Sequence, residues 1–458
     1  MTPAHTHSDR VLPAESEQHS QPTGMRLEGG WVIPIEPTGA VLADHAVVVR
    51  DDRIAAVLPR TEAAEAYPDF PAIDLSDQIL IPGLVNAHTH AAMTLFRGFA
   101  DDLALSDWLQ QRIWPAEARL VTPEFVADGT RLACLEMLRG GITMFADMYF
   151  YPDEAITAAV AAGIRMNVGL VYLTVPTNYA KDQDDYLRKG LQVWQQWHDH
   201  PQVRFALAPH ATYSTTPESM QAIPALCSEY DLGVHTHLHE TAQEVSDEQR
   251  DFGMTGVARL QQAGALGDRF FGAHGVHLNA EDIAVLAETG SSVVHCPSSN
   301  LKLGSGVAPI AELLAAGVNV GLGTDGAASN NRLDLWQEMR TAALLAKGIT
   351  GDPTVVPAHQ ALRMATLAGA QALGRADDLG SLTPGKQADV VAVSAHSLAG
   401  APIYDPVSAV VYALGREHVS NVWVAGRQVV AEGVCTTIND HDALTSVRQW
   451  LPKVRGDK

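Results

Sequence analysis

Two histidines follow the first strongly apolar stretch of the chain. Residues 79–85 are apolar throughout, with a Pro-Gly break, and His88 and His90 come soon after them. Side chains two positions apart in an extended strand point to the same side. Both imidazoles can therefore bind one metal ion in their neutral form. A His-x-His pair also arises by chance in a chain with 19 histidines, so the metal hypothesis needs support from other residues.

Polar residues at the ends of later predicted strands complete a set of metal ligands. The fifth predicted strand carries His237 and the eighth ends at Asp325, within Gly-Thr-Asp-Gly. With the first pair they offer three nitrogens and one oxygen, which suits Zn²⁺ and leaves a position for water. Fe²⁺ is compatible with the same ligands. We expect one ion, because the fourth strand ends without a lysine; the polar stretch around Lys181 and Lys189 holds the nearest ones.

Glu240 is the candidate general base. It stands three residues beyond His237, just past the predicted strand, where it can reach a water at the metal. The competing interpretation is an exposed carboxylate, which is the usual state of a glutamate. The fourth strand ends at His210, and the sixth carries His274 and His277. In a barrel of parallel strands all these groups would meet at one end.

Four further histidines are not assigned to the metal. His235 points to the same side as the proposed ligand on its strand but lies deeper, so we expect a hydrogen-bonded core or supporting residue. His239 and His277 are interpreted as structural or rim residues, and His295 stays undecided between a supporting and a core role. Three large apolar residues can line a pocket or belong to the core: Met93, Trp108 and Trp114.

Alternating strand and helix signals organise the central region. Helical stretches such as 124–139 and 281–288 lie between the strands. Eight strand–helix units in about 300 residues predict a (β/α)8 TIM barrel. An open, doubly wound sheet is the alternative, but no Gly-x-Gly-x-x-Gly turn supports it. The eight predicted strands are residues 80–90, 143–149, 165–172, 204–210, 233–240, 269–278, 291–298 and 319–325.

The two ends of the chain predict a second, smaller domain. Both are rich in short β-branched strands with turns between them, such as Asp51-Asp52 near the start and Gly426-Arg427 near the end. We expect one β-sandwich built from both ends. The predicted division is a disordered extension over 1–24, the sandwich over 25–82 and 388–458, and the metal-dependent barrel over 83–387.

Composition and charge exclude several kinds of partner. The chain has 458 residues, is 46% hydrophobic and carries a formal charge of −22, which repels phosphate backbones and anionic lipid. We expect no nucleic-acid or membrane partner, and no stretch is long and apolar enough to span a bilayer. Four cysteines without paired spacing and no secretory signal indicate a reducing, cytoplasmic location.

The assembled motifs resemble those of the amidohydrolase superfamily. They are Pro-Gly-Leu-Val-Asn-Ala-His-Thr-His at 82–90, His-Leu-His-Glu-Thr at 237–241, Ser-Asn-Leu-Lys-Leu-Gly at 299–304 and Gly-Thr-Asp-Gly-Ala-Ala-Ser-Asn-Asn at 323–331. The first and last are specific to the superfamily. The third and the end of the fourth resemble the branch of methylthioadenosine/S-adenosylhomocysteine deaminases, with triazine hydrolases and guanine deaminases as relatives. The resemblance extends from about residue 25 to the C-terminus.

This resemblance implies an activity and a set of roles. The activity is hydrolytic deamination of an adenine nucleoside to the inosine analogue and ammonia, by a homodimer or homotetramer. The implied roles are His88, His90, His237 and Asp325 as ligands of one zinc ion, Glu240 and Asp325 in proton transfer, His274 in holding the attacking water, Glu117 in binding the ribose hydroxyls and His210 in contacting the substrate.

One departure from the family pattern bears on the substrate. Members that accept S-adenosylhomocysteine hold its carboxylate with arginines after the third strand. Residues 168–173 here read Val-Gly-Leu-Val-Tyr-Leu, without an arginine. We therefore expect 5′-methylthioadenosine or adenosine to be preferred over S-adenosylhomocysteine.

Two alternatives stay open from the sequence. The same scaffold can hydrolyse another amino- or chloro-substituted heterocycle, such as a triazine, guanine or cytosine. A catalytically inactive barrel kept for assembly is the other alternative. The complete ligand set together with Glu240 speaks against it, because an inactive descendant would be expected to lose at least one of these residues.

Overall fold

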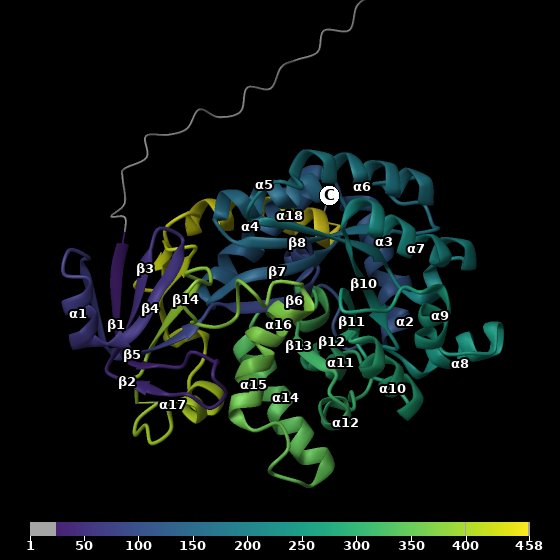
Figure 1. Cartoon of the computed structure of the whole chain (residues 1–458). Coiled ribbons are helices and arrows are strands. Elements are labelled where there is room, and N and C mark those ends of the chain that lie inside the picture. The colour runs from purple at the N-terminus through teal and green to yellow at the C-terminus, as the bar shows by residue number, and fades with distance from the viewer. Residues whose placement is uncertain (1–23, 399, 457–458) are drawn as a thin grey trace, which may run out of the picture.

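The structure is a computed structural model that describes residues 24–398 and 400–456. Two β-sheets organise it (Figure 1). An eight-stranded parallel sheet forms the centre, and a nine-stranded mixed sheet lies to one side of it. This is the predicted combination of a barrel with a β-domain assembled from both chain ends.

The eight central strands follow one another in sequence order, and every paired neighbour is parallel. The first and last strands approach each other where Asp325 N donates to His88 O at 3.0 Å. Asn86 and Thr324 exchange two further hydrogen bonds, of 2.7 and 2.9 Å. This sequential order excludes the doubly wound alternative. The strands are β6 (Leu84–Thr89), β7 (Ile142–Met148), β8 (Arg165–Tyr172), β9 (Val203–Pro209), β10 (Gly233–Leu238), β11 (Phe270–His274), β12 (Ser292–His295) and β13 (Asn319–Leu322).

Helices surround the barrel and connect its strands (Figure 1). The helix over Pro123–Arg139 shows why they form where they do: Thr122 Oγ1 accepts from Phe125 N at its start, and Gly140 and Gly141 end it. No helix of the described residues is long and apolar enough to cross a membrane. The longer helices are α4 (Pro123–Arg139), α5 (Pro152–Ala162), α6 (Gln183–Trp197), α7 (Pro217–Tyr230), α8 (Ala242–Phe252), α9 (Gly256–Ala263), α10 (Ala280–Thr289), α14 (Leu335–Thr350) and α15 (Ala358–Met364).

Short helical segments connect the strands and the longer helices, and several of them directly follow a barrel strand. Two consecutive ones, Leu105–Trp108 and Trp114–Leu120, are separated by a π-helical turn. Such turns often occur at functional sites. The short segments are η1 (Ala91–Phe96), α2 (Leu105–Trp108), η2 (Leu109–Ile113), α3 (Trp114–Leu120), η3 (Thr212–Ser214), α11 (Pro297–Lys302), α12 (Ile310–Ala315), α13 (Ala327–Asn330) and α16 (Leu367–Ala372).

The second sheet takes strands from both ends of the chain. Its order is β17-β16-β15-β14-β5-β1-β3-β4, with β2 beside β1, so hydrogen bonds link all of its strands into one continuous sheet. The antiparallel pairing of β14 with β5 joins the two halves, and Leu27, Val47 and Trp423 contribute to a core of its own. The elements are β1 (Gly24–Val32), β2 (Leu42–Ala43), β3 (His45–Arg50), β4 (Arg53–Pro59), α1 (Arg60–Ala66), β5 (Ala72–Pro82), β14 (Val390–Ser394), α17 (Pro406–Ser408), η4 (Ala409–Ala413), η5 (Arg416–His418), β15 (Val419–Val424), β16 (Arg427–Ala431) and β17 (Val434–Cys435).

The first predicted barrel strand, 80–90, is divided in the structure. Residues up to Pro82 belong to β5 of the second sheet, and the barrel strand β6 begins at Leu84. At the junction Gly83 N donates to Asp389 O, and Leu84 N donates to Gly141 O. The chain thus changes partners at this point, which an uninterrupted apolar run does not reveal.

The chain ends also differ in part from the expectation. Residues 1–23 of the expected disordered extension lie outside the described residues, and Gly24 begins β1. Within the range expected to be sandwich, helix α18 (Asp440–Arg455) packs on the barrel helix α4 instead of on the sheet. Trp450 Nε1 donates to Asp128 Oδ2 at 2.9 Å, and the Trp450 ring stacks edge-on against Phe125.

A buried ion pair joins the barrel to the second sheet. Arg165 Nη2 of β8 lies 3.1 Å from Asp389 Oδ1 and 2.7 Å from Gln387 Oε1. The two charged side chains are only 3% and 4% exposed. Removal of one partner leaves the other charge buried without compensation, which costs about 3–5 kcal/mol.

We expect Arg165→Ala to lower the free energy of unfolding by about that amount, about 3–5 kcal/mol, in urea denaturation. The control is Arg139→Ala, whose partner Asp440 is as exposed as Arg139 itself. Exposed ion pairs contribute little to stability, so the control should change the unfolding free energy only slightly. A loss in Arg165→Ala no larger than in Arg139→Ala would contradict the structural role of this pair.

Candidate active site and metal centre

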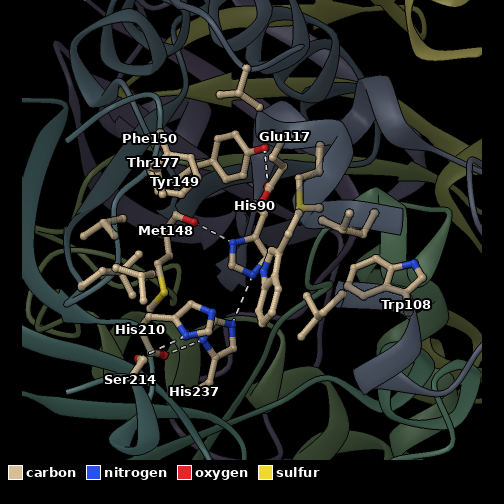
Figure 2. A pocket seen from close by; sticks show the side chains of 18 of the residues that line it. His90, Trp108, Glu117, Met148, Tyr149, Phe150, Thr177, His210, Ser214 and His237 are labelled. Atoms are coloured by element: carbon tan, nitrogen blue, oxygen red, sulfur yellow. Dashed lines mark hydrogen bonds between the residues drawn. The ribbon is translucent and has the colours of Figure 1, made fainter. Parts of the chain in front are cut away.

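A cavity of about 720 Å³ opens where the barrel strands end. Its lining is mainly apolar and comes from the strand ends, from α2, η2 and α3, and from the segment after β8. Figure 2 shows part of this lining, with side chains from different strands directed toward one another. The ionisable and imidazole groups in the lining are His90, Glu117, Tyr149, His210, Tyr213, His237, Glu240, His274 and Asp325.

Two histidine nitrogens lie close to one carboxylate oxygen, and a third histidine nitrogen lies beside one of them. Asp325 Oδ1 lies 3.2 Å from His90 Nε2 and 3.5 Å from His88 Nε2. His237 Nε2 lies 3.2 Å from His90 Nε2. Ligand atoms of His88, His237 and His274 also lie within 4.8 Å of one another. The structure thus brings together the four predicted ligands, which come from β6, β10 and the residues after β13.

Hydrogen bonds to the backbone determine the tautomers of two of these imidazoles. His90 Nδ1 donates to Met148 O at 2.6 Å, and His237 Nδ1 donates to His210 O at 2.6 Å. In the neutral rings the Nε2 atoms then carry lone pairs, and these face each other at 3.2 Å (Figure 2). Facing lone pairs repel unless a proton or a metal ion lies between them. The two Nε2 atoms are thus placed where they could bind a metal ion.

A buried histidine pair orients the third imidazole. His88 Nδ1 lies 2.8 Å from His235 Nε2, and among the described residues the buried His88 Nε2 has no hydrogen-bond partner. When His88 carries its proton on Nδ1, Nε2 is a free acceptor beside Asp325. An unsatisfied buried acceptor is costly, and a metal ion would satisfy this one. The expected supporting role of His235 agrees with this hydrogen bond.

The charges of the cluster favour a cation. Burial lowers the pKa of His88 to about 4 and holds the pKa of His237 well below its usual value, so both are neutral. Burial acts in the same direction on His90, but the Asp325 carboxylate outweighs it and raises the pKa of His90 to about 9. Burial would raise the pKa of Asp325, yet the adjacent His88 and His90 hold it well below its usual range. A proton or a metal can supply the positive charge that the carboxylate attracts.

Hydrogen bonds hold both carboxylate oxygens of Asp325 in place. Oδ2 accepts from Ser299 Oγ at 2.6 Å and from Ser329 Oγ at 2.7 Å, whereas Oδ1 accepts from Gly326 N and faces the histidines. The backbone of Asp325 adopts φ +58°, a left-handed conformation that is uncommon for residues other than glycine. This conformation aims the carboxylate into the cluster. It is maintained because helices α11 and α13 supply the two serines.

Glu240 and His274 lie next to the cluster. Glu240 Oε2 is 3.8 Å from His274 Nε2, and Glu240 Oε1 accepts from Ser305 Oγ at 3.3 Å. His274 Nδ1 bonds to Asn300 Oδ1 at 2.8 Å, which requires a proton on Nδ1 and turns Nε2 toward Glu240. Burial raises the pKa of Glu240, and the charge of His274 opposes this rise. Glu240 thus holds a proton more readily than an exposed glutamate would, beside an imidazole with which it can exchange one.

The predicted substrate-binding residues line the same cavity. Glu117 Oε1 accepts from Tyr149 Oη at 2.7 Å (Figure 2). Burial raises the pKa of Glu117 to about 7, although this hydrogen bond opposes the rise. His210 lies beside His237, with its Nδ1 3.4 Å from Ser214 Oγ, and burial lowers its pKa to about 4. His210 is therefore neutral and can donate or accept a hydrogen bond in the cavity.

The remaining histidines are not part of the cluster of proposed metal ligands. His239 Nδ1 lies 3.6 Å from Asp282 Oδ2 and its Nε2 accepts from a backbone amide, so it is a structural residue. His277 Nε2 donates to a backbone carbonyl oxygen at 2.8 Å and is half-buried. His295 is buried, which lowers its pKa to about 3. The three apolar residues considered for the pocket all line the cavity: Met93, Trp108 and Trp114.

Several supporting residues were not identified from the sequence. Ser299, Asn300 and Ser329 lie inside motifs that resemble the family, but no role was assigned to them. Ser299 and Asn300 contact residues 26 positions away in the chain, so only the structure shows these contacts, whereas Ser329 lies four residues from Asp325. Tyr149 had a usable signal, because it directly follows β7 at the end of the barrel where functional groups gather.

Comparisons with known proteins agree with this geometry. A family model described as the amidohydrolase family matches residues 79–429. A 5-methylthioadenosine/S-adenosylhomocysteine deaminase of Teredinibacter turnerae is 42% identical over 428 residues, 93% of this chain and 97% of the relative. A zinc-bound adenosine deaminase from Xanthomonas campestris is 44% identical, with a TM-score of 0.92 over 94% of this chain and 98% of that chain. A zinc-bound atrazine chlorohydrolase from Arthrobacter aurescens is 27% identical, with a TM-score of 0.86 over 93% and 100%. The chain belongs to the amidohydrolase family.

Proposed function

We propose that this protein hydrolytically deaminates an adenine nucleoside to the inosine analogue and ammonia, with 5′-methylthioadenosine or adenosine preferred. The proposal rests on the cavity at the end of the barrel. Residues that could bind a metal ion line this cavity, together with the carboxylates of Glu240 and Glu117. The relatives named as deaminases of adenine nucleosides, at 42% and 44% identity over almost the whole chain, support the same substrate class.

The residues that would hold the metal are His88, His90, His237 and Asp325. Zinc is the proposed ion, because nitrogen and carboxylate ligands suit it and the two solved relatives named above contain it. Fe²⁺ has compatible ligand preferences. When bound, a divalent metal supplies a Lewis acid that lowers the pKa of water toward neutrality.

The reaction adds water to C6 of the purine and releases the amine as ammonia. His274 holds the attacking water with Nε2, because Asn300 engages its other nitrogen. Glu240 takes one proton from this water and delivers it to N1 of the purine. Asp325 helps to pass the second proton to the departing amine. Glu117 binds the ribose hydroxyls and so orients the base toward these groups.

The cavity offers no lysine or arginine to the 5′ substituent. None of the described lining residues is of either type, and the lining at and after the end of the third strand includes Val171, Leu173 and Val175. A 5′-methylthio group fits an apolar wall, whereas the carboxylate of S-adenosylhomocysteine would lack a charged partner. This supports the preference for 5′-methylthioadenosine or adenosine.

The alternative substrates are less well supported. A free heterocycle such as guanine, cytosine or a triazine has no hydroxyls for Glu117, which would then be a buried carboxylate without a ligand. An inactive scaffold has no need for the Nε2 atoms that converge on Asp325. A homodimer or homotetramer and a cytoplasmic location stay predictions from the resemblance and the composition.

Ammonia release from a panel of substrates tests the function. We expect kcat/KM for 5′-methylthioadenosine and adenosine to exceed that for S-adenosylhomocysteine by about ten- to hundred-fold, the value of a missing hydrogen bond to a charged group. Guanine and cytosine should release no ammonia. Equal rates with S-adenosylhomocysteine would disprove the 5′ preference, and release from the free bases alone would disprove the nucleoside assignment.

Metal analysis tests the ligand set. Purified protein should contain about one zinc or iron per chain, and His237→Ala should lose most of it. Chelation should also lower the melting temperature, because a ligand that binds only the folded state stabilises it. The matched control is His277→Gln, a histidine at the same end of the barrel outside the cluster. Metal retained in His237→Ala at the level of the control would refute the assignment.

Glu240→Gln tests the proton transfer separately from the metal. The amide has the same size but cannot accept the proton, so turnover should fall by about 10²–10⁴. Metal content should stay as in the unmodified protein, because Glu240 is not one of the proposed ligands. Near-normal turnover in this variant would exclude Glu240 as the general base.

A further inference from the structure

We propose that Tyr149 is a positioning residue that holds Glu117 in place for the ribose hydroxyls of the substrate. Its hydroxyl donates to Glu117 Oε1 at 2.7 Å. Among the described residues no group bonds to Glu117 Oε2, and Glu117 lines the cavity. One oxygen is thus held and the other is offered to the substrate. This inference rests on the proposed function.

The position of Tyr149 in the barrel connects the ribose site to the metal cluster. Met148 and Tyr149 are neighbours at the end of β7. The carbonyl oxygen of Met148 accepts from His90 Nδ1, and the next side chain holds Glu117 (Figure 2). Two adjacent residues therefore orient a proposed metal ligand and the proposed ribose carboxylate. The end of β7 therefore sets the distance between the proposed binding sites of the purine base and of the ribose.

Tyr149 is itself held firmly. Its side chain is 6% exposed, and its ring packs on Phe150 with 5.2 Å between the ring centroids. Burial and the adjacent Glu117 hold the pKa of Tyr149 well above its usual value, so its hydroxyl stays protonated and remains a donor. A hydroxyl on a rigid, buried ring can hold a carboxylate in one orientation.

Glu117 needs such support because the rest of its surroundings restrain only the backbone. It lies on α3, a helix of seven residues, which Asn178 Nδ2 holds by donating to Ala118 O at 2.9 Å. No other side-chain hydrogen bond to the Glu117 carboxylate is recorded among the described residues. A glutamate side chain without a partner loses considerable rotamer freedom when it binds a ligand. The Tyr149 hydroxyl removes that cost before the substrate arrives.

The test removes only the hydroxyl. Tyr149→Phe keeps the buried ring, and ammonia release is measured with adenosine and with 2′,3′-dideoxyadenosine, which lacks the 2′- and 3′-hydroxyls. We expect kcat/KM for adenosine to fall about ten-fold or more, mainly through KM, because a hydrogen bond to a charged group is lost. The value for dideoxyadenosine should change less than two-fold. Metal content should not change.

A double variant shows whether Tyr149 acts through Glu117. In the Glu117→Ala background, Tyr149→Phe should cause no further loss with adenosine, because residues that act together are not additive. The matched control is Tyr151→Phe, which removes a hydroxyl from the same loop that donates to Asn178 O instead of to Glu117. Any change in kcat/KM that Tyr151→Phe causes should be equal for adenosine and for dideoxyadenosine.

The outcomes are distinct. An equal loss with adenosine and dideoxyadenosine, or no loss with either, would overturn the positioning role while the deaminase function stands. A further ten-fold loss in the Glu117→Ala background would also overturn it, because Tyr149 would then act independently. Absence of ammonia release from both nucleosides with the unmodified enzyme would disprove the proposed function instead.

Discussion

The arrangement of the site depends on imidazole nitrogens that are held at short distance from one another and from one carboxylate oxygen. The Nε2 atoms of His90 and His237 lie 3.2 Å apart, and Asp325 raises the pKa of His90 to about 9, so at neutral pH a proton or a metal ion lies among these groups. The barrel maintains this arrangement because the opposite nitrogens donate to the backbone oxygens of Met148 and His210. The binding energy of the proposed metal ion would therefore be coupled to the stability of the fold.

The cavity beside this cluster changes the acidity of its carboxylic acids. Burial raises the pKa of both Glu117 and Glu240, yet their partners differ. Glu240 faces His274 and a serine hydroxyl, which suits a group that exchanges protons. Glu117 accepts from the Tyr149 hydroxyl, which suits a group that only binds. Two glutamates in one apolar cavity thus have different surroundings, which agree with the different roles proposed for them.

The second sheet contributes to the site through the strand that carries the first histidines. β5 ends at Pro82, and after Gly83 the chain enters β6, so the sheet anchors the start of the strand that leads to His88 and His90. A side chain at Gly83 would collide with Thr143 of the barrel. The buried Arg165–Asp389 pair connects the same two units a short distance away. The β-domain is therefore part of the support of the metal cluster.

The sequence by itself determined the barrel, the β-domain from both ends and the four proposed ligands. Strand periodicity places side chains two residues apart on one face, and parallel strands place their carboxyl ends together, so His88, His90, His237 and Asp325 could be grouped without coordinates. The β5–β6 break, the packing of α18 and the partners of each imidazole nitrogen were decided by the tertiary structure. The serines on Asp325 and the hydroxyl of Tyr149 on Glu117 also belong to this group. Apart from Ser329, which lies four residues from Asp325, these contacts join segments distant in the chain, and no local periodicity encodes which loops will meet.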